Sequence, residues 1–329
     1  MKRRLLFGLL IPSATVLTLA AVTEAALRVA FVNSLDFGVE MWKYAAQLKQ
    51  PVSNPRIRFV HRPNGHARLM RVDVSINGQG LRDREYSLQK PPGAYRIMML
   101  GDSTTFGWGV PIAETTAKHL ERDLNGAGGR QVEVLNAGVG NYNTVQEVSS
   151  YVERGRLFRP DLVILVYFIN DAEPTPADQS GWLRNRSYFL AFALSRYDAL
   201  LRLTGGRPGW RTYYDSLYSD SQPGWRDAAG AIADLARQTR RDGASLLVAI
   251  LPELHQINGD YPFTRAHAMV RAAAEAAGAP VVELIDGLQG HGPESELWVT
   301  PLDDHPNGKA NALVAAQLRA WVLAHEAAP

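Results

Sequence analysis

The stretch Tyr95-Arg-Ile-Met-Met-Leu-Gly-Asp-Ser-Thr-Thr-Phe-Gly107 decides the fold. Its apolar run is stopped by Gly101, and small polar residues follow before a segment compatible with a helix. This order predicts a buried strand that turns sharply into a helix. Ser103 then stands at the carboxyl end of a strand, the edge at which open α/β sheets bind ligands. It is therefore a candidate nucleophile, and the alternative is a simple Ser/Thr helix cap.

Strand and helix patterns alternate from this stretch to the end of the chain. Apolar runs predict strands over 95–100, 132–136, 162–168, 245–251 and 280–284. Periodic segments predict helices over 114–124, 143–157, 226–241, 263–277 and 309–324. The alternation predicts a parallel sheet in a three-layer α/β/α sandwich of flavodoxin-like type.

The N-terminus carries a membrane signal. Lys2, Arg3 and Arg4 precede an uncharged run from Leu5 to Val22, close to the ~20 residues that span a bilayer. The basic residues should stay in the cytoplasm, which places the rest of the chain outside, in the periplasm of a Gram-negative cell. A cleaved signal peptide is the alternative. We favour an uncleaved single-pass anchor over 1–31, because the helical pattern continues beyond the run.

Three further regions follow from composition shifts. Residues 32–92 are expected to form a connecting region without clear periodicity over 32–56, and then a small β-rich lead-in with strands near 57–60 and 72–76. The main domain covers 93–329. It contains an aromatic-rich insertion at about 172–225, in which 187–203 has an apolar helical face. The insertion is interpreted as a lid, a helix on the bilayer surface, or a segment filling its own small core.

Composition excludes several classes of function. The formal net charge of the 329 residues is only +2, so we expect no nucleic-acid partner. The absence of cysteine excludes a disulfide scaffold, thiolate chemistry and cysteine-ligated zinc. We expect no metal and no cofactor.

Four polar blocks lie where the predicted strands end. They are Gly101-Asp-Ser103, Asn136-Ala-Gly-Val-Gly-Asn-Tyr-Asn-Thr144, Phe168-Ile-Asn-Asp171 and Thr300-Pro-Leu-Asp-Asp-His-Pro-Asn307. His305 in the fourth block could take a proton from a serine hydroxyl, which is a weak nucleophile without a base. Asp303 or Asp304 could orient the imidazole. His255 is a possible pocket residue.

The four blocks, in this order and spacing, resemble those of the SGNH (GDSL-like) hydrolase family over roughly 95–325. The anchor and the lead-in around Asn77-Gly-Gln-Gly80 resemble a membrane-anchored bacterial branch. The resemblance implies that Ser103 is the nucleophile, that His305 is the base, and that Asn170 and the Ser103 N–H contribute to an oxyanion hole.

The chain departs from the family pattern at three positions. The family glycine of the second block is Asn141 here, with Gly140 just before it, so either N–H could be the further oxyanion donor. Phe168 stands where the family often has glycine, and Leu302 stands where many members place the orienting aspartate. The Asp-x-His variant of related branches makes Asp303 the orienter.

The resulting hypothesis is a membrane-anchored extracytoplasmic serine esterase that acts through an acyl-serine. Its expected substrates are O-acyl groups of cell-surface glycans or lipids. An O-acyltransferase would use the same site. A non-catalytic glycan-binding or assembly component that keeps the fold is the alternative from another class.

Overall fold

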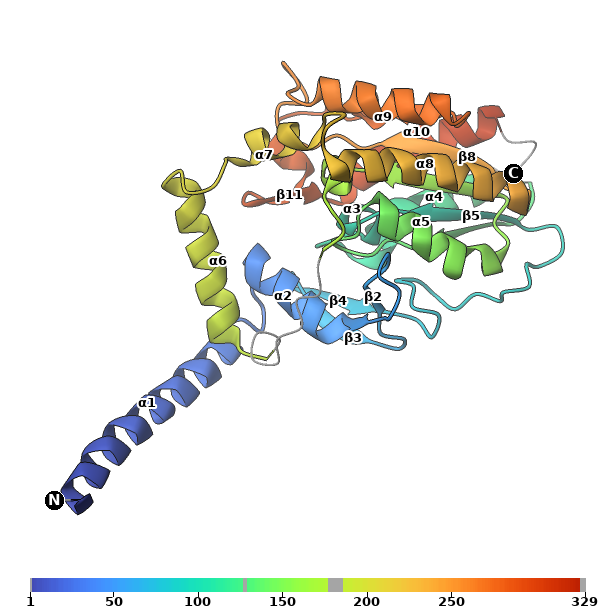
Figure 1. Ribbon diagram of the computed structural model, residues 1–329. Coiled ribbons are helices and arrows are strands. Elements are labelled where there is room, and N and C mark those ends of the chain that lie inside the picture. The colour runs from blue at the N-terminus through green and yellow to red at the C-terminus, as the bar shows by residue number, and fades with distance from the viewer. Residues whose placement is uncertain (1, 127–128, 177–185, 326–329) are drawn as a thin grey trace.

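The structure is a computed structural model that describes residues 2–126, 129–176 and 186–325. Its centre is a five-stranded parallel sheet of order β6-β5-β7-β8-β9 (Figure 1). The strands are β5 (Tyr95–Leu100), β6 (Val132–Asn136), β7 (Leu162–Tyr167), β8 (Ser245–Ile250) and β9 (Val281–Glu283). The predicted parallel α/β/α sandwich is confirmed. In this strand order the direction of winding reverses beside β5, which is where such sheets form their ligand crevice.

Helices cover both faces of the sheet. On one face lie α4 (Thr116–Asn125) and α10 (Gly308–His325), and on the other α5 (Thr144–Glu153), α8 (Pro223–Asp242) and α9 (Thr264–Ala276). Successive residues of β5 alternate between the two layers: Met98 and Leu100 join the α5/α8 core, whereas Ile97 and Met99 join the α4/α10 core. Burial on both sides explains why the strand ends in the continuous apolar run Ile97–Leu100.

Short elements complete the connections of the main domain. They are α3 (Ser103–Phe106), the 3-10 turns η1 (Ile112–Glu114), η2 (Gly155–Phe158), η3 (Ile169–Ala172), η4 (Leu284–Gly287) and η5 (Glu294–Leu297), and the antiparallel pair β10 (Trp298–Thr300) and β11 (Asp303–Pro306). The fourth polar block, expected as a loop, is therefore partly a hairpin.

The region before the sheet packs tightly on the main domain. It contains α2 (Phe37–Leu48) and the antiparallel pairs of β1 (Lys49–Pro51) with β2 (Phe59–His61) and of β3 (His66–Leu69) with β4 (Val72–Ser75). Its core includes Tyr44 and Leu48 together with Phe106 and Trp108, which follow the candidate nucleophile.

The expectation that 32–56 lacks a periodic element is wrong for residues 37–48. The buried face of α2 carries Glu40 and Lys43, whose Nζ and Oε1 atoms lie 2.8 Å apart. These two side chains are only 0% and 4% exposed. Charges on the inward face conceal the apolar periodicity by which an amphipathic helix is recognised.

Three helices lie outside the sandwich. α1 (Lys2–Ala30) projects away from the body, and α6 (Tyr188–Leu203) runs from its end toward α7 (Trp210–Leu217) (Figure 1). Residues Leu10–Ala30 are long and apolar enough to cross a membrane, and none of their most apolar window is buried. The helix expected over 187–203 is found as α6. Part of the predicted insertion, residues 177–185, lies outside the described residues.

Candidate active site

Ser103 sits where β5 ends. Gly101 separates the strand from α3, and a Cβ built on it would lie 2.1 Å from Thr105 Oγ1, so only glycine fits this turn. The Asp102 carboxylate accepts hydrogen bonds of 2.8 Å from both the N–H and the hydroxyl of Thr104, which caps α3. Asp102 therefore caps the turn. The turn presents the Ser103 hydroxyl beyond the edge of the sheet.

A chain of hydrogen bonds joins Ser103 to the fourth block. Ser103 Oγ lies 2.8 Å from His305 Nε2, and His305 Nδ1 lies 2.6 Å from Asp303 Oδ1. Because a carboxylate only accepts, Nδ1 carries the proton and Nε2 is left to accept the serine O–H. Trp108 Nε1 donates to the other oxygen of Asp303 at 3.0 Å. This geometry allows His305 to take the hydroxyl proton of Ser103.

The strand geometry of β11 explains which acidic residue contacts His305. Asp303 and His305 are two positions apart and point to one face, so Asp304 points to the other. Many members of the SGNH hydrolase family have aspartate at the position of Leu302. This leucine side chain is 94% exposed and cannot orient His305. Of the two acids considered from the sequence, the structure brings Asp303 to His305.

The local electrostatics favour a charged imidazole beside a charged carboxylate. Burial alone would lower the pKa of His305, but its hydrogen bond to Asp303 and the charges of Asp303, Asp304 and Asp102 raise it above the usual value. Burial would likewise raise the pKa of Asp303, yet the contacts with His305 and Trp108 hold it below its usual value. Asp303 thus stays ionised while His305 gains a proton.

Asn170 comes to the same place from the neighbouring strand. It lies in η3, just after β7, and its Nδ2 donates to Asp102 Oδ2 at 3.1 Å. The same Asp102 oxygen lies 3.4 Å from Ser103 Oγ. The Asn170 amide is therefore adjacent to the serine hydroxyl. Asp171 accepts the N–H of Phe168 at 3.1 Å and so closes the turn after β7.

In the second block, the two candidate oxyanion donors, Gly140 and Asn141, have different environments. The Gly140 N–H donates to the Tyr44 hydroxyl at 2.9 Å. Asn141 is exposed and has a φ of 64°, the left-handed conformation that asparagine tolerates better than other non-glycine residues. This explains why asparagine can stand at the family's glycine position. It also shows that the Gly140 N–H already has an acceptor.

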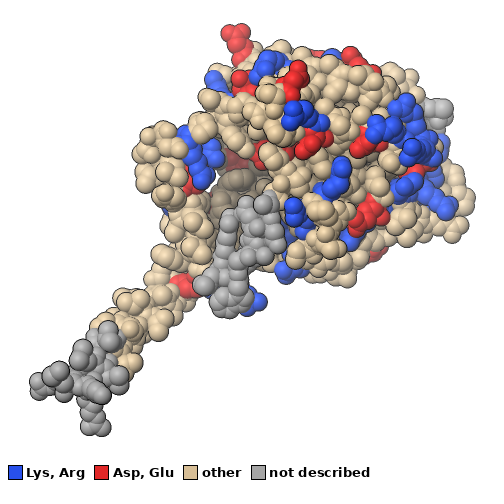
Figure 2. Space-filling view, in the orientation of Figure 1, with Lys and Arg blue, Asp and Glu red and all other residues tan. Residues whose placement is uncertain are grey.

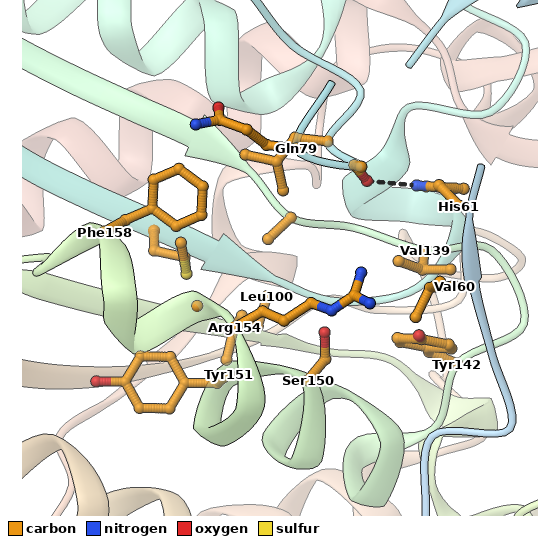
Figure 3. Close-up of a pocket in the computed structure, with 15 residues that line it drawn as sticks. Val60, His61, Gln79, Leu100, Val139, Tyr142, Ser150, Tyr151, Arg154 and Phe158 are labelled. Atoms are coloured by element: carbon orange, nitrogen blue, oxygen red, sulfur yellow. Dashed lines mark hydrogen bonds between the residues drawn. The ribbon is translucent and has the colours of Figure 1, made fainter. Parts of the chain in front are cut away.

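Tyr44 belongs to a buried relay that fixes this block. His61 Nδ1 lies 3.0 Å from the Gly80 carbonyl (Figure 3), and its Nε2 lies 2.6 Å from the Tyr44 hydroxyl. Burial lowers the pKa of His61 to about 3, so the ring is neutral. It donates to Gly80, accepts from Tyr44, and leaves the Tyr44 oxygen to accept from Gly140. Tyr44 could not be anticipated from the sequence, because α2 was not predicted.

Replacing Tyr44 by Phe tests this relay. The change leaves the Gly140 N–H and His61 Nε2 without partners in a buried place, which should destabilise the protein by about 1–3 kcal/mol. Thermal melting in detergent measures the loss. Tyr197→Phe, at a side chain 58% exposed, is the control and should melt like the wild type. Equal melting temperatures for the two variants would show that the relay does not stabilise the block.

The cavity drawn in Figure 3 lies beside this relay and not at Ser103. It is enclosed by the lead-in, β5 and α5, with Val60, His61, Tyr142, Tyr151 and Phe158 among its lining residues. Arg154 extends across it. None of Ser103, Asp303 and His305 lines it. It is therefore separate from the candidate active site.

His255 lies on the far side of Asp304. Its Nδ1 is 3.5 Å from Asp304 Oδ2 and is also bonded to Glu253. Its ring centroid lies 4.5 Å from that of Trp298. Potential ligand atoms of Glu253, His255 and Asp304 all lie within 4.8 Å of one another, which is the spacing at which a metal ion could be held. His255 thus joins Asp304, not Ser103.

Two aromatic rings border His305 that the sequence did not reveal. The ring centroid of Phe37, at the start of α2, lies 5.6 Å from that of His305, and that of Trp108 lies 6.2 Å away. Phe37 is 41% exposed. The helix α2 therefore supplies a side chain that borders the candidate base.

Comparisons with known proteins identify similar solved structures and one matching family. Similar solved structures include TesA (15% identity, TM-score 0.46, 69% of this chain and 98% of that one) and the lipase/acylhydrolase from Enterococcus faecalis (14%, 0.45, 69% and 95%). Another is the psychrotrophic esterase EstA from Pseudoalteromonas sp. (14%, 0.45, 70% and 97%). The search of curated proteins finds no match. Residues 99–313 match the model of the GDSL-like lipase/acylhydrolase family, and the chain belongs to that family.

Proposed function

We propose that the protein is a membrane-anchored, extracytoplasmic serine esterase that acts through an acyl-serine intermediate. One observation carries the proposal: Ser103 Oγ lies 2.8 Å from His305 Nε2, while the other imidazole nitrogen lies 2.6 Å from Asp303. A nucleophile, a base and an orienting carboxylate are thus already connected. A purely structural role for the fold would not need this arrangement, which argues against a non-catalytic binding or assembly component.

In the first half of the reaction Ser103 Oγ attacks the carbonyl carbon of an acyl ester. Its proton passes to His305 Nε2, and the charge of Asp303 stabilises the resulting imidazolium. When the tetrahedral intermediate collapses, the bond to the alcohol breaks and the alcohol oxygen takes the proton from His305. The acyl group remains on Ser103.

The negative oxygen of the intermediate needs donors. The Ser103 N–H and the Asn170 amide are the first two, and Asn170 would exchange its bond to Asp102 for one to the oxyanion. Gly140 donates to Tyr44 in this structure. Its neighbour Asn141, in the left-handed conformation, is therefore our preferred third donor.

In the second half a water molecule attacks the acyl carbon and gives a proton to His305. The bond between the acyl carbon and Ser103 Oγ then breaks, Ser103 Oγ takes the proton from His305, and the acid is released. An acceptor hydroxyl in place of water would make the reaction an acyl transfer.

The substrates we propose are O-acyl groups on cell-surface glycans or lipids, because the candidate span and the basic N-terminus favour a position outside the cytoplasmic membrane. A C-terminal reporter active only in the cytoplasm should stay silent, and an active one would contradict this topology.

Hydrolysis of p-nitrophenyl esters of graded chain length tests the activity directly. The full chain in detergent should release p-nitrophenol, and Ser103→Ala should reduce the rate to that of a protein-free control. Ser295→Ala, in η5, is the matched serine variant and should keep the activity. Equal rates for the wild type and Ser103→Ala would refute the esterase proposal.

The pH dependence of kcat/KM follows from the electrostatics of His305. The imidazole must be neutral to accept the serine proton, and Asp303 raises its pKa above 6.5. Activity should therefore rise with pH through an apparent pKa above that value. Asp303→Asn removes the charge, so the midpoint should move to lower pH while kcat falls by roughly 10⁴-fold. A midpoint unmoved in Asp303→Asn would contradict the assigned pair.

A further inference from the structure

α6 has two different faces. Its inner face packs against other parts of the chain: the ring centroids of Phe192 and Phe31, just after α1, are 5.5 Å apart, and those of Tyr188 and Trp42 of α2 are 4.8 Å apart. A Cβ added to Gly38 would meet Ser195 Oγ at 2.2 Å, so α6 and α2 touch at this point. This inner face thus makes contacts within the chain.

The outer face of α6 is apolar and exposed. Its side chains are 44–86% exposed and recur with helical spacing: Phe189, Leu194, Tyr197, Leu200 and Leu203. At 100° per residue they lie on the side of the helix away from Ser195. The charged residues Asp198 and Arg202 lie outside this apolar stripe, whereas Arg196 lies within its arc and pairs with Asp36. Contiguous exposed apolar surface of this kind marks an interaction site with a protein or a membrane.

Contacts between α1 and the start of α6 place this outer face next to the candidate membrane span. The Glu24 carboxylate of α1 accepts the N–H groups of Tyr188 at 3.0 Å and of Phe189 at 3.1 Å, which caps the first turn of α6. Arg28 donates to the carbonyl of Arg186 at 2.7 Å. Glu24 is also the first charged residue after the uncharged run of the candidate span. α6 therefore begins at the level where α1 would leave the membrane.

We propose that the outer face of α6 lies on the bilayer surface as an interfacial helix. The exposed apolar surface of α1 continues into that of α6 at the Glu24 cap, and both face away from the folded body (Figure 1). Arg196, 53% exposed, lies among the apolar side chains of this face and can reach lipid phosphates. The inference rests on the proposed anchoring of α1.

The docking would place the active site close to the lipid. Arg196 of α6 pairs with Asp36 at 2.5 Å, and the next residue, Phe37, borders His305. Figure 2 shows a recess between the arm formed by α6 and the main body. The candidate active site would then receive acyl esters that are themselves held at the membrane surface.

Single-cysteine labelling tests the docking on the full chain. The protein has no cysteine, so each introduced one can be labelled uniquely with a fluorophore. The chain is reconstituted in vesicles of phosphatidylcholine and phosphatidylglycerol that carry a nitroxide lipid. Leu17→Cys reports the span, Leu200→Cys the outer face of α6, Arg202→Cys the opposite side of the same helix, and Arg237→Cys the aqueous body.

We expect strong quenching at Leu17, quenching at Leu200 several-fold above that at Arg237, and an intermediate value at Arg202. Quenching at Leu17 with Leu200 indistinguishable from Arg237 would overturn the docking while leaving the anchor intact. A Leu200 label shielded from an aqueous quencher but not reached by the nitroxide lipid would assign the face to a second copy of the chain, and would also overturn it. No quenching at Leu17 would refute the anchoring and, with it, this inference.

Discussion

Replacing His305 by Ala is expected to lower kcat by roughly 10⁴- to 10⁶-fold while the protein stays folded. His305 is the only group that contacts both Ser103 Oγ and Asp303 in the chain of hydrogen bonds described above. Without it the serine hydroxyl has no base, and the carboxylate of Asp303 loses the cation that it would stabilise. Steady-state hydrolysis of a short p-nitrophenyl ester measures the loss.

The variant needs a matched control, because any histidine substitution could change stability. His291→Ala, at an exposed position in the segment before η5, should keep wild-type kcat and melting temperature. A Ser103→Ala/His305→Ala double variant should be hardly slower than either single one, because the two residues act as a unit. A His305→Ala protein within tenfold of wild type would exclude His305 as the base.

Replacing Asn170 by Ala is expected to lower kcat by roughly 10²- to 10³-fold, or about 2.7–4 kcal/mol of transition-state stabilisation. The amide is adjacent to Ser103 but would donate to the substrate oxygen only once that oxygen carries charge. The loss should therefore appear in kcat and leave KM nearly unchanged. Labelling of Ser103 by a reactive phosphonate should be slowed, not abolished.

The control for Asn170 is Asn258→Ala, an amide that donates to the Gly292 carbonyl at 3.3 Å in an exposed loop. It should behave like the wild type. A rise in KM with unchanged kcat in Asn170→Ala would instead assign the amide to ground-state binding of the substrate. Melting temperatures are needed for both variants, because Asn170 also donates to the buried Asp102.

The sandwich could be predicted from the sequence because its strands are buried on both sides. The continuous apolar runs of β5 and β7 end abruptly in polar residues, and parallel strands bring those ends to one edge. The resemblance then gave roles to Ser103, Asn170 and His305, which the structure places together. Within the fourth block, the choice between Asp303 and Asp304 follows from the two-residue period of β11, an element expected as a loop.

The parts of the site that were missed come from outside the sandwich. α2 hides its periodicity behind the buried pair of Glu40 and Lys43, so neither Phe37 beside His305 nor Tyr44 beneath Gly140 could be anticipated. Trp108 follows the nucleophile in the sequence, yet its hydrogen bond to Asp303 joins residues far apart along the chain. Pairings of this kind depend on tertiary packing, which local patterns do not encode.

The central claim is that Ser103 is an activated nucleophile, and a fluorophosphonate tests it most directly. The serine oxygen would displace fluoride and form a phosphonyl adduct whose mass and position can be read by peptide mass spectrometry. The full-length protein in detergent should carry one adduct, on Ser103, and His305→Ala should lose most of it. A folded wild-type protein that stays unlabelled, or that is labelled on another serine, would contradict the account.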